Sequence, residues 1–312
     1  MKRPPRIAVL GSLNIDLTYR VPQLPVPGET IPCKEVSKGF GGKGANQAIA
    51  ARRAGAEVVM IGCLGNDADG TQYLERLVAE GINTEGVSRI DDSPTGSAII
   101  CVEDSGENSI IVHGGANDRT STEIVESHRS SIEQADLLLT QFECPYKSVQ
   151  LASRIAAEAG TKVIVNPSPW NAKFNTYSIP CDFLITNELE AELLASGSSI
   201  GPDRTISERL DHVQTKCLVV TNGSQATTAT TTCGEHYSDT PAQTIPVDTV
   251  GAGDTFAGYF GFAAAQERPI PEILRIANVA GAMATQKIGA QSSMPWRNEV
   301  EEEMQRNKFI SA

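Results

Sequence analysis

The sequence contains no uninterrupted apolar run of about 18 residues, the length that a membrane-spanning helix requires. Its start, Met1-Lys-Arg-Pro-Pro-Arg6, passes directly into a short strand-like segment and not into the apolar stretch of a secretory signal. We therefore expect a cytoplasmic protein with no membrane contact.

The sequence also lacks a Cys-x-x-Cys pair, and its 7 cysteines are odd in number and widely scattered. This spacing argues against a disulfide framework and against a structural zinc site. The 4 histidines lie in unrelated contexts without metal-ligand spacing. We assign no chemistry to either residue type.

Positive charge is scarce. The net charge is −12 and the pI is about 4.9, so no basic stripe is available to neutralise a phosphate backbone. Nucleic acid and anionic membrane are therefore poor candidate partners, although backbone N–H groups can still bind a small anion. No P-loop motif occurs either, so any bound nucleotide would be held by a different structural motif.

What the sequence does contain is an alternation of short apolar runs with helix-length amphipathic stretches. Continuous apolarity over strand length is typical of strands buried on both faces, and hence of a parallel sheet between helix layers. The runs are Ile7–Leu10, Val58–Ile61, Leu137–Leu139, Val163–Val165, Phe183–Ile185 and Leu218–Val220, and the Thr-rich segment 226–239 then predicts an antiparallel edge. With 312 residues, 40% of them hydrophobic, the chain can bury one large core, and we predict one α/β domain over residues 1–312.

Two regions, about 14–40 and 95–114, interrupt this rhythm with shorter β-prone runs. In the second region, Ser97–Val102 and Ser109–Val112 are joined by the turn Asp104-Ser-Gly-Glu-Asn108. A hairpin inserted into an α/β domain must cover something or expose its apolar face. We predict a small β-sheet lid over the main sheet; the alternative is a hairpin without function.

The first glycine-rich loop, Gly39–Gln47, runs into the helix-like stretch Ala48–Ala54, which Gly55 stops. Taken literally it satisfies the dinucleotide-binding pattern G-x-G-x-x-G. That pattern should follow a buried strand, whereas the preceding segment 31–38 is polar and contains proline. A nicotinamide cofactor is therefore disfavoured.

The second glycine-rich loop, Asp248–Asp254, precedes the helix-like stretch Thr255–Phe262. Such a loop presents backbone N–H groups at the positive end of a helix dipole, where they can stabilise a transferring phosphoryl group. Asp254 would be repelled by phosphate unless its task were to accept a proton from the attacking hydroxyl. Taken alone, Asp254 could equally be the N-cap of the following helix.

The segments Gly41–Ala48 and Asp248–Phe256 together resemble the two signatures of the ribokinase-like (PfkB) carbohydrate kinase family. Further matching segments are Gly11–Asp16, Asn166–Pro169, Thr186–Glu190 and Gly289–Trp296. The resemblance covers nearly the whole chain and implies a three-layer α/β sandwich with a mainly parallel central sheet and a small β-sheet lid. Within the family, the chain is most similar to the kinases of ribose.

This resemblance implies a sugar site in which Asn14 and Asp16 bind hydroxyls. It adds Gly42, Lys43 and Asn46 to the pocket lining and Glu143 on the opposite side. The residues themselves agree, because a carboxylate and an amide in the turn after the first core strand suit vicinal hydroxyls. A simple Asx turn is an equally common reading of an isolated Asn-x-Asp.

By the same resemblance, Asp254 is the base and the backbone of Gly251, Ala252 and Gly253 forms the anion hole. The ATP and Mg²⁺ positions are Asn187, Glu190, Thr221, Gly223, Ser224, Gln225, Ala226, Gly253 and Asn278. Ala226 departs from the family, where glycine is usual. Asn187 could instead cap the helix that follows it, and Asn278 could be a solvent-facing residue of a helix.

Many family members also bind a monovalent cation, usually K⁺, through carbonyl oxygens beside the anion hole. The matching positions are Asp248, Val250, Ala284, Lys287, Gly289 and Ser293. Hard cations take oxygen ligands, and Lys287 would contribute its carbonyl and not its ammonium.

The expected activity is therefore ATP-dependent phosphorylation of the 5-hydroxyl of a sugar, with ribose the best single candidate. Kinases of deoxyribose, fructose or nucleosides are alternatives from the same family, and a non-catalytic sugar-binding regulatory protein is an alternative from another class. The resemblance also implies a homodimer formed through the lids, to which Ile99, Ile111 and Val112 could contribute.

Overall fold

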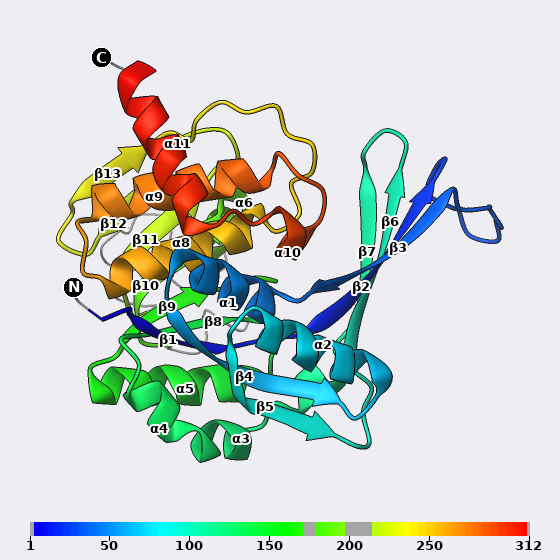
Figure 1. Cartoon of the computed structure of the whole chain (residues 1–312), viewed down its shortest axis with the longest axis horizontal. Helices are drawn as coiled ribbons and strands as arrows, with labels where there is room; N and C mark the ends of the chain where they lie inside the picture. Colours follow the sequence, from blue (N-terminus) through cyan, green and yellow to red (C-terminus); the bar gives the residue numbers. More distant parts are fainter. Residues whose placement is uncertain (1–2, 171–178, 197–213, 311–312) are drawn as a thin grey trace.

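The computed structural model describes residues 3–170, 179–196 and 214–310. Its main body contains a nine-stranded sheet between two layers of helices, and a second, four-stranded sheet projects from that body (Figure 1). The predicted fold class is confirmed.

The large sheet has the spatial order β13-β12-β11-β10-β9-β8-β1-β4-β5. All neighbouring pairs from β11 to β5 are parallel, and β12 and β13 extend the sheet as antiparallel strands. The strands are β1 (Arg6–Leu10), β4 (Glu57–Gly65), β5 (Asn83–Ile90), β8 (Leu137–Gln141), β9 (Lys162–Asn166), β10 (Cys181–Asn187), β11 (Thr215–Thr221), β12 (Thr227–Thr231) and β13 (His236–Asp239).

The six apolar runs all lie in parallel strands, and the antiparallel edge after residue 226 is also confirmed. Strand β5 was not predicted from the sequence, and its residues are mostly half-buried or exposed. An edge strand with one neighbour needs no continuous apolar run, so the pattern that identified the central strands is absent from it.

Alternate residues of each central strand enter two different cores. Ile7 and Val9 of β1 belong to one core, whereas Ala8 and Leu10 belong to the other. The first core is covered by α1 (Lys43–Ala54), α2 (Ala68–Ala79), α8 (Ala252–Ala265), α9 (Ile270–Ala284) and α11 (Arg297–Ile310). The second is covered by α3 (Thr122–Ser127), α4 (Arg129–Glu133), α5 (Tyr146–Ala159) and α6 (Glu188–Ser196).

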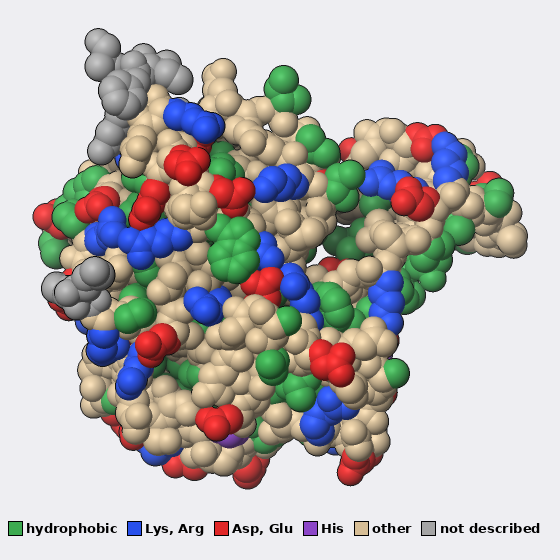
Figure 2. Space-filling view, viewed as in Figure 1, with side chains coloured by type: hydrophobic (Ala, Val, Ile, Leu, Met, Phe, Trp, Pro, Cys, Tyr) green, Lys and Arg blue, Asp and Glu red, His purple; other side chains and the backbone are tan. Residues whose placement is uncertain are grey.

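The projecting sheet has the order β3-β2-β6-β7, with β2 and β6 parallel and the two outer pairs antiparallel. Its strands are β2 (Asn14–Val21), β3 (Glu35–Gly41), β6 (Gly96–Glu103) and β7 (Asn108–His113). A short 3₁₀ helix, η1 (Gly115–Arg119), follows β7. Figure 2 shows the molecule hollowed between this sheet and the main body.

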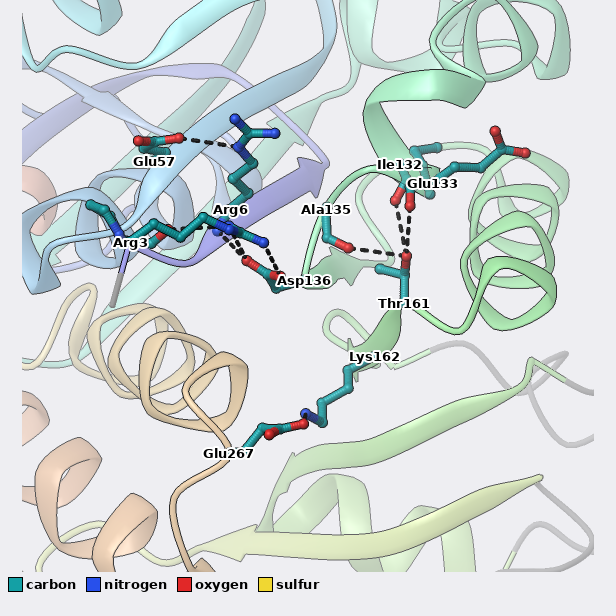
Figure 3. Close-up of polar contacts among 11 residues, drawn as sticks. Arg3, Arg6, Glu57, Ile132, Glu133, Ala135, Asp136, Thr161, Lys162 and Glu267 are labelled. Atoms are coloured by element: carbon teal, nitrogen blue, oxygen red, sulfur yellow. Dashed lines mark hydrogen bonds and ion pairs between the residues drawn. The ribbon is translucent and has the colours of Figure 1, made fainter. Parts of the chain in front are cut away.

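The amino-terminal edge of the large sheet is held by polar contacts that Figure 3 shows. The Asp136 carboxylate accepts hydrogen bonds from the Arg3 guanidinium at 2.7 and 2.8 Å and from the Arg6 backbone N–H at 2.7 Å. The Thr161 hydroxyl donates to the carbonyl oxygens of Ile132 and Ala135, near the end of α4. The Lys162 ammonium pairs with the Glu267 carboxylate at 3.2 Å. These contacts join the first strand to β8 and β9 on the side opposite the loops described below.

Helices α1 and α8 are in close contact at Gly258. A Cβ atom at that position would lie 2.7 Å from the carbonyl oxygen of Gln47 and 2.8 Å from the backbone nitrogen of Ala51. Backbone atoms cannot rotate away, so only glycine allows this separation between the helices. The contact brings the start of α1 next to the start of α8.

We predict that Gly258→Ala lowers the free energy of unfolding by about 1–3 kcal/mol, because the added methyl overpacks a contact between two backbones. Gly261→Ala is the matched control on the same helix, since its Cβ would meet only side-chain atoms, the nearest at 3.6 Å. Urea denaturation of both variants should show a loss for Gly258→Ala alone. Equal midpoints for the two variants would contradict the prediction.

Candidate active site

The candidate site lies where the carboxyl ends of the central strands meet, under the projecting sheet. Parallel strands bring the residues that follow them to one edge of a sheet, where ligands of α/β proteins commonly bind. Here β1 leads to Ser12, β8 to Glu143, and β9, β10 and β11 end at Asn166, Asn187 and Thr221. The first turns of α1 and α8 face the same edge.

The loop before α1 lies directly on the loop after β1. A Cβ at Gly44 would lie 2.5 Å from the backbone of Gly11, so neither residue has room for a side chain. The Glu143 carboxylate joins the two loops, accepting a hydrogen bond from the Ser12 hydroxyl and one of 3.1 Å from the Lys43 backbone N–H. Glu143 thus has an organising role in addition to the sugar contact expected of it.

Asn14 and Asp16 lie in β2, not in the turn that the sequence indicated, and the Asx-turn alternative is therefore wrong. Asn14 is buried, and its Oδ1 accepts a hydrogen bond of 2.7 Å from Asn117 Nδ2. Asn117 is itself fixed by the backbone N–H of Leu13, which donates to its Oδ1 at 2.9 Å. Among the described residues none accepts a hydrogen bond from Asn14 Nδ2, so its amide hydrogens are available to a ligand.

Asp16 sits in a strongly negative part of the site. Burial raises the pKa of Asp16 to about 7, and the negative charges of Glu143 and Asp254 add to the effect. A carboxyl group with this pKa is neutral in mild acid and charged above neutrality. In either form it can hydrogen-bond a hydroxyl group, but only the carboxylate accepts with both oxygens.

Both carboxylate oxygens of Asp254 accept hydrogen bonds from neighbouring residues of α1. Asn46 Nδ2 donates to Oδ2 at 2.9 Å, and Gln47 Nε2 donates to Oδ1 at 3.0 Å. The Asp254 side chain is 8% exposed. Each oxygen keeps a second lone pair, so the carboxylate can still accept a proton from a bound hydroxyl.

Helix α8 begins at Ala252, and its N-cap is Gly251 with φ of 77°. The N-cap alternative for Asp254 is therefore wrong, because Asp254 lies within the first turn. Ala252 donates to Thr249 and Thr255 donates to Gly251, whereas the N–H groups of Gly253 and Asp254 have no protein acceptor in the described part of the chain. Unpaired N–H groups at a helix start favour an anion.

A cavity of about 240 Å³ lies in front of these N–H groups. It is lined by Lys43, Asn166, Ser168, Ile185, Thr186, Asn187, Glu190, Thr221, Thr249, Gly251, Gly253 and Asp254. Burial works to lower the pKa of Lys43, but the carboxylates of Asp254, Glu143 and Glu190 outweigh it and raise that pKa above its ordinary value. Lys43 therefore stays cationic beside the cavity.

A second cavity of about 460 Å³ shares Thr221, Thr249 and Gly253 with the first. Its lining is mostly small or apolar, and among the residues predicted to contact the nucleotide it includes Thr221, Gly223, Ser224, Gly253 and Asn278. Gln225 and Ala226 do not line it. The two cavities together offer a phosphate-sized and a base-sized space around one helix start.

Asn278 is buried, so the solvent-facing alternative is wrong. Its Oδ1 accepts a hydrogen bond of 2.8 Å from the Thr227 hydroxyl, and its Nδ2 donates to Asp239 at 2.7 and 2.9 Å. The side chain thus joins α9 to β12 and β13 while forming part of the cavity wall.

Asn187 and Glu190 form a reciprocal cap at the start of α6. Asn187 Oδ1 accepts from the Glu190 backbone N–H at 2.7 Å, and Glu190 Oε2 accepts from the Asn187 backbone N–H at 3.0 Å. The capping alternative for Asn187 is therefore present in the structure. Glu190 keeps Oε1 for a water molecule or a cation, and both residues line the 240 Å³ cavity.

Of the positions expected around a monovalent cation, the structure brings Asp248, Val250 and Gly289 into direct contact. The Asp248 carboxylate accepts from the Val250 and Gly289 backbone N–H groups at 3.0 and 2.8 Å. Its own backbone N–H donates to Thr285 at the end of α9, where Ala284 and Lys287 share a turn. Ser293 lies in the following helix, α10 (Ala290–Ser293), and bonds locally to Ala290.

Four buried amide side chains behind the site were not predicted from the sequence. Gln47, Asn117, Gln141 and Gln291 all hydrogen-bond to residues that were predicted, or to one another. Gln47 and Gln291 lie inside the quoted motifs, so their position was available as a signal. Their partners come from other elements, which is information that a one-dimensional pattern does not carry.

Comparison with known proteins identifies several relatives. The family model described as pfkB family carbohydrate kinase matches residues 4–297. A ribokinase of Schizosaccharomyces pombe is 36% identical over 306 residues, covering 95% of this chain and 96% of the relative. Solved ribokinase structures include that of Giardia lamblia (27% identity, TM-score 0.87, 97% and 99% covered) and that of Arabidopsis thaliana with ribose and ATP (30%, 0.81, 96% and 98%).

We predict that Asp16→Asn stabilises the protein more at pH 8 than at pH 5. The folded-state pKa of Asp16, about 7, is raised above the unfolded value, so ionisation weakens folding as the pH rises from about 4 to 7. Asparagine removes this cost without changing the volume. Thermal melting at the two pH values should show the larger gain at pH 8, whereas the exposed control Asp92→Asn should show no such difference. Equal gains at both pH values would contradict the prediction.

Proposed function

This chain belongs to the pfkB family of carbohydrate kinases, and from that premise we propose that it transfers the γ-phosphoryl group of ATP to the 5-hydroxyl of D-ribose. The observation that carries the proposal is the position of Asp254. Its carboxylate is held by two amides within the first turn of α8, beside unpaired N–H groups and the cationic Lys43. A proton acceptor and an anion site therefore lie in one cavity.

The projecting sheet acts as the lid of a single domain, and the sugar binds beneath it. The Asn14 amide donates to one hydroxyl, and the Asp16 carboxyl group accepts from another. Asn46, Glu143 and the backbone of Gly42 and Lys43 complete the pocket. These residues come from β2, the start of α1 and the end of β8, which Glu143 and Asn117 hold together.

Asp254 takes the proton of the 5-hydroxyl as that oxygen attacks the γ-phosphorus. The new O–P bond forms while the bond to the β-phosphate oxygen breaks, and its electron pair leaves with ADP. The backbone from Gly251 to Asp254 stabilises the charge on the transferred group through the N–H groups of Gly253 and Asp254, because these are oriented before the reaction begins. Lys43, which also lines the cavity, attracts the same charge.

ATP occupies the two connected cavities, with its base near Asn278, Thr221, Gly223 and Ser224. Asn187 and Glu190 would hold Mg²⁺ through water, since this ion keeps several water ligands and uses few carboxylates. When bound, the ion neutralises charge on the β- and γ-phosphate oxygens. Carbonyl groups near Asp248 and Gly289 would hold K⁺ and so keep the two segments that flank the anion hole together.

We place the reaction in the cytoplasm, where ATP is available and where the 7 cysteines, all free thiols in the structure, remain reduced.

We also propose a homodimer formed through the lids. Strand β7 is the terminal strand of its sheet, and its residues Ile110, Ile111 and Val112 are 55%, 67% and 54% exposed. An exposed apolar edge strand offers both unpaired backbone groups and apolar area to a second copy.

The activity is tested by following ADP release with ribose, 2-deoxyribose, fructose and a nucleoside, each with K⁺ or Na⁺ as the only monovalent cation. Ribose should give the highest kcat/KM, and K⁺ should raise turnover. Asp254→Asn should lower kcat by about 10²–10⁴-fold, because the general base is lost while the amide keeps the shape of the site. Turnover of that variant within about tenfold of the wild type would remove Asp254 from the base role.

The dimer is tested by light scattering after size-exclusion chromatography. We expect Ile111→Glu to shift the protein from the dimer mass to the monomer mass, because a buried, unpaired charge opposes the contact. Val78→Glu, at an apolar position on α2 that is 58% exposed, should stay dimeric. A wild-type chain that runs as a monomer would overturn this part of the proposal.

A further inference from the structure

Gln47 is fully buried, and its amide connects four elements of the site. Its Nε2 donates to Asp254 Oδ1 of α8 at 3.0 Å and to Asn166 Oδ1 at the end of β9 at 3.1 Å. Its Oε1 accepts a hydrogen bond of 2.6 Å from Gln141 Nε2 at the end of β8. Both amide hydrogens and the carbonyl oxygen are therefore used within the protein.

The orientation of this amide is fixed by the backbone behind it. Asn166 Nδ2 donates to the Ile185 carbonyl oxygen at 2.8 Å, so Asn166 must turn its Oδ1 toward Gln47. Gln47 must then present its amide hydrogens to both Asn166 and Asp254. A flipped amide would direct Oε1 at the Asp254 carboxylate and leave two acceptors facing each other.

Asn46 and Gln47 hold different oxygens of Asp254, but only Asn46 belongs to the expected sugar pocket. From this difference we propose that Gln47 is a positioning residue, which orients the Asp254 carboxylate so that it can accept the proton of the bound hydroxyl. The inference rests on the proposed kinase reaction. The hydrogen bonds of Gln47 with Gln141 and Asn166 anchor its amide to the carboxyl ends of β8 and β9.

The charged groups around Asp254 explain why a neutral donor is needed there. Asp16 of β2, Glu143 after β8 and Glu190 of α6 are acidic, and Lys43 of α1 is the positive group among them. An N–H donor stabilises the ionised form of a carboxylate without adding a charge that would compete for the phosphates. Removing the donor should make Asp254 bind its proton more tightly.

The test is the pH dependence of kcat for Gln47→Leu with ribose and ATP. We expect kcat at neutral pH to fall by about 10- to 100-fold, the size expected when a catalytic group is displaced, with little change in either KM. The acidic limb of the kcat–pH profile should move to higher pH, so that part of the loss is recovered in base. Thr140→Val is the control, because its buried hydroxyl in β8 has no hydrogen-bond partner in the described residues.

Gln141→Leu provides a second variant, which leaves Gln47 in place but removes the donor that holds its Oε1. It should show a smaller loss of kcat and a shift of the acidic limb in the same direction, even if Gln47→Leu does not fold. An unshifted profile in the folded variant, or an equal loss of kcat at every pH, would overturn the positioning role. A wild-type chain that releases no ADP with any sugar would overturn the proposed function as well, whereas a fully active Gln47→Leu variant would overturn the positioning role alone.

Discussion

The site depends on the close contact between α1 and α8 at Gly258. This contact sets how near the first turn of α1 lies to the first turn of α8, and hence whether Asn46 and Gln47 can reach Asp254. Hydrogen bonds of about 3 Å tolerate little displacement, so a shift of one helix would separate the carboxylate from its donors. Gly258, the residue that allows this contact, has no side chain and lies one helical turn after Asp254.

The clustered carboxylates of the site lower the stability of the folded protein. Asp16, Glu143, Glu190 and Asp254 converge on one region with Lys43, and the raised pKa of Asp16 reflects the cost of placing a carboxylate there. Buried charges are tolerated when they are hydrogen-bonded. Here most of the donors are backbone N–H groups and side-chain amides, which hold the carboxylates without neutralising them and leave the site able to bind hydroxyls and phosphate.

The amino ends and the carboxyl ends of the parallel strands differ in their polar contacts. At the amino ends, hydrogen bonds between protein groups connect strands and helices, and they involve Arg3, Asp136 and Thr161. At the carboxyl ends of the parallel strands, the start of α8 leaves the N–H groups of Gly253 and Asp254 without an acceptor among the described residues, beside two cavities that share part of their lining. This difference follows from the parallel arrangement, because all the parallel strands have their carboxyl ends on the same side of the sheet.

The sequence by itself determined the α/β class, the central strands and the two glycine loops, because continuous apolar runs and clustered glycines are local signals. It could not exclude the N-cap role for Asp254, which required knowing that α8 begins at Ala252 with Gly251 as its N-cap. It also could not reveal that Asn278 is buried or that Gln47 and Gln141 support the site. Those facts depend on which helices and strand ends meet, and residues more than 200 positions apart, such as Gln47 and Asp254, are brought together only by tertiary packing.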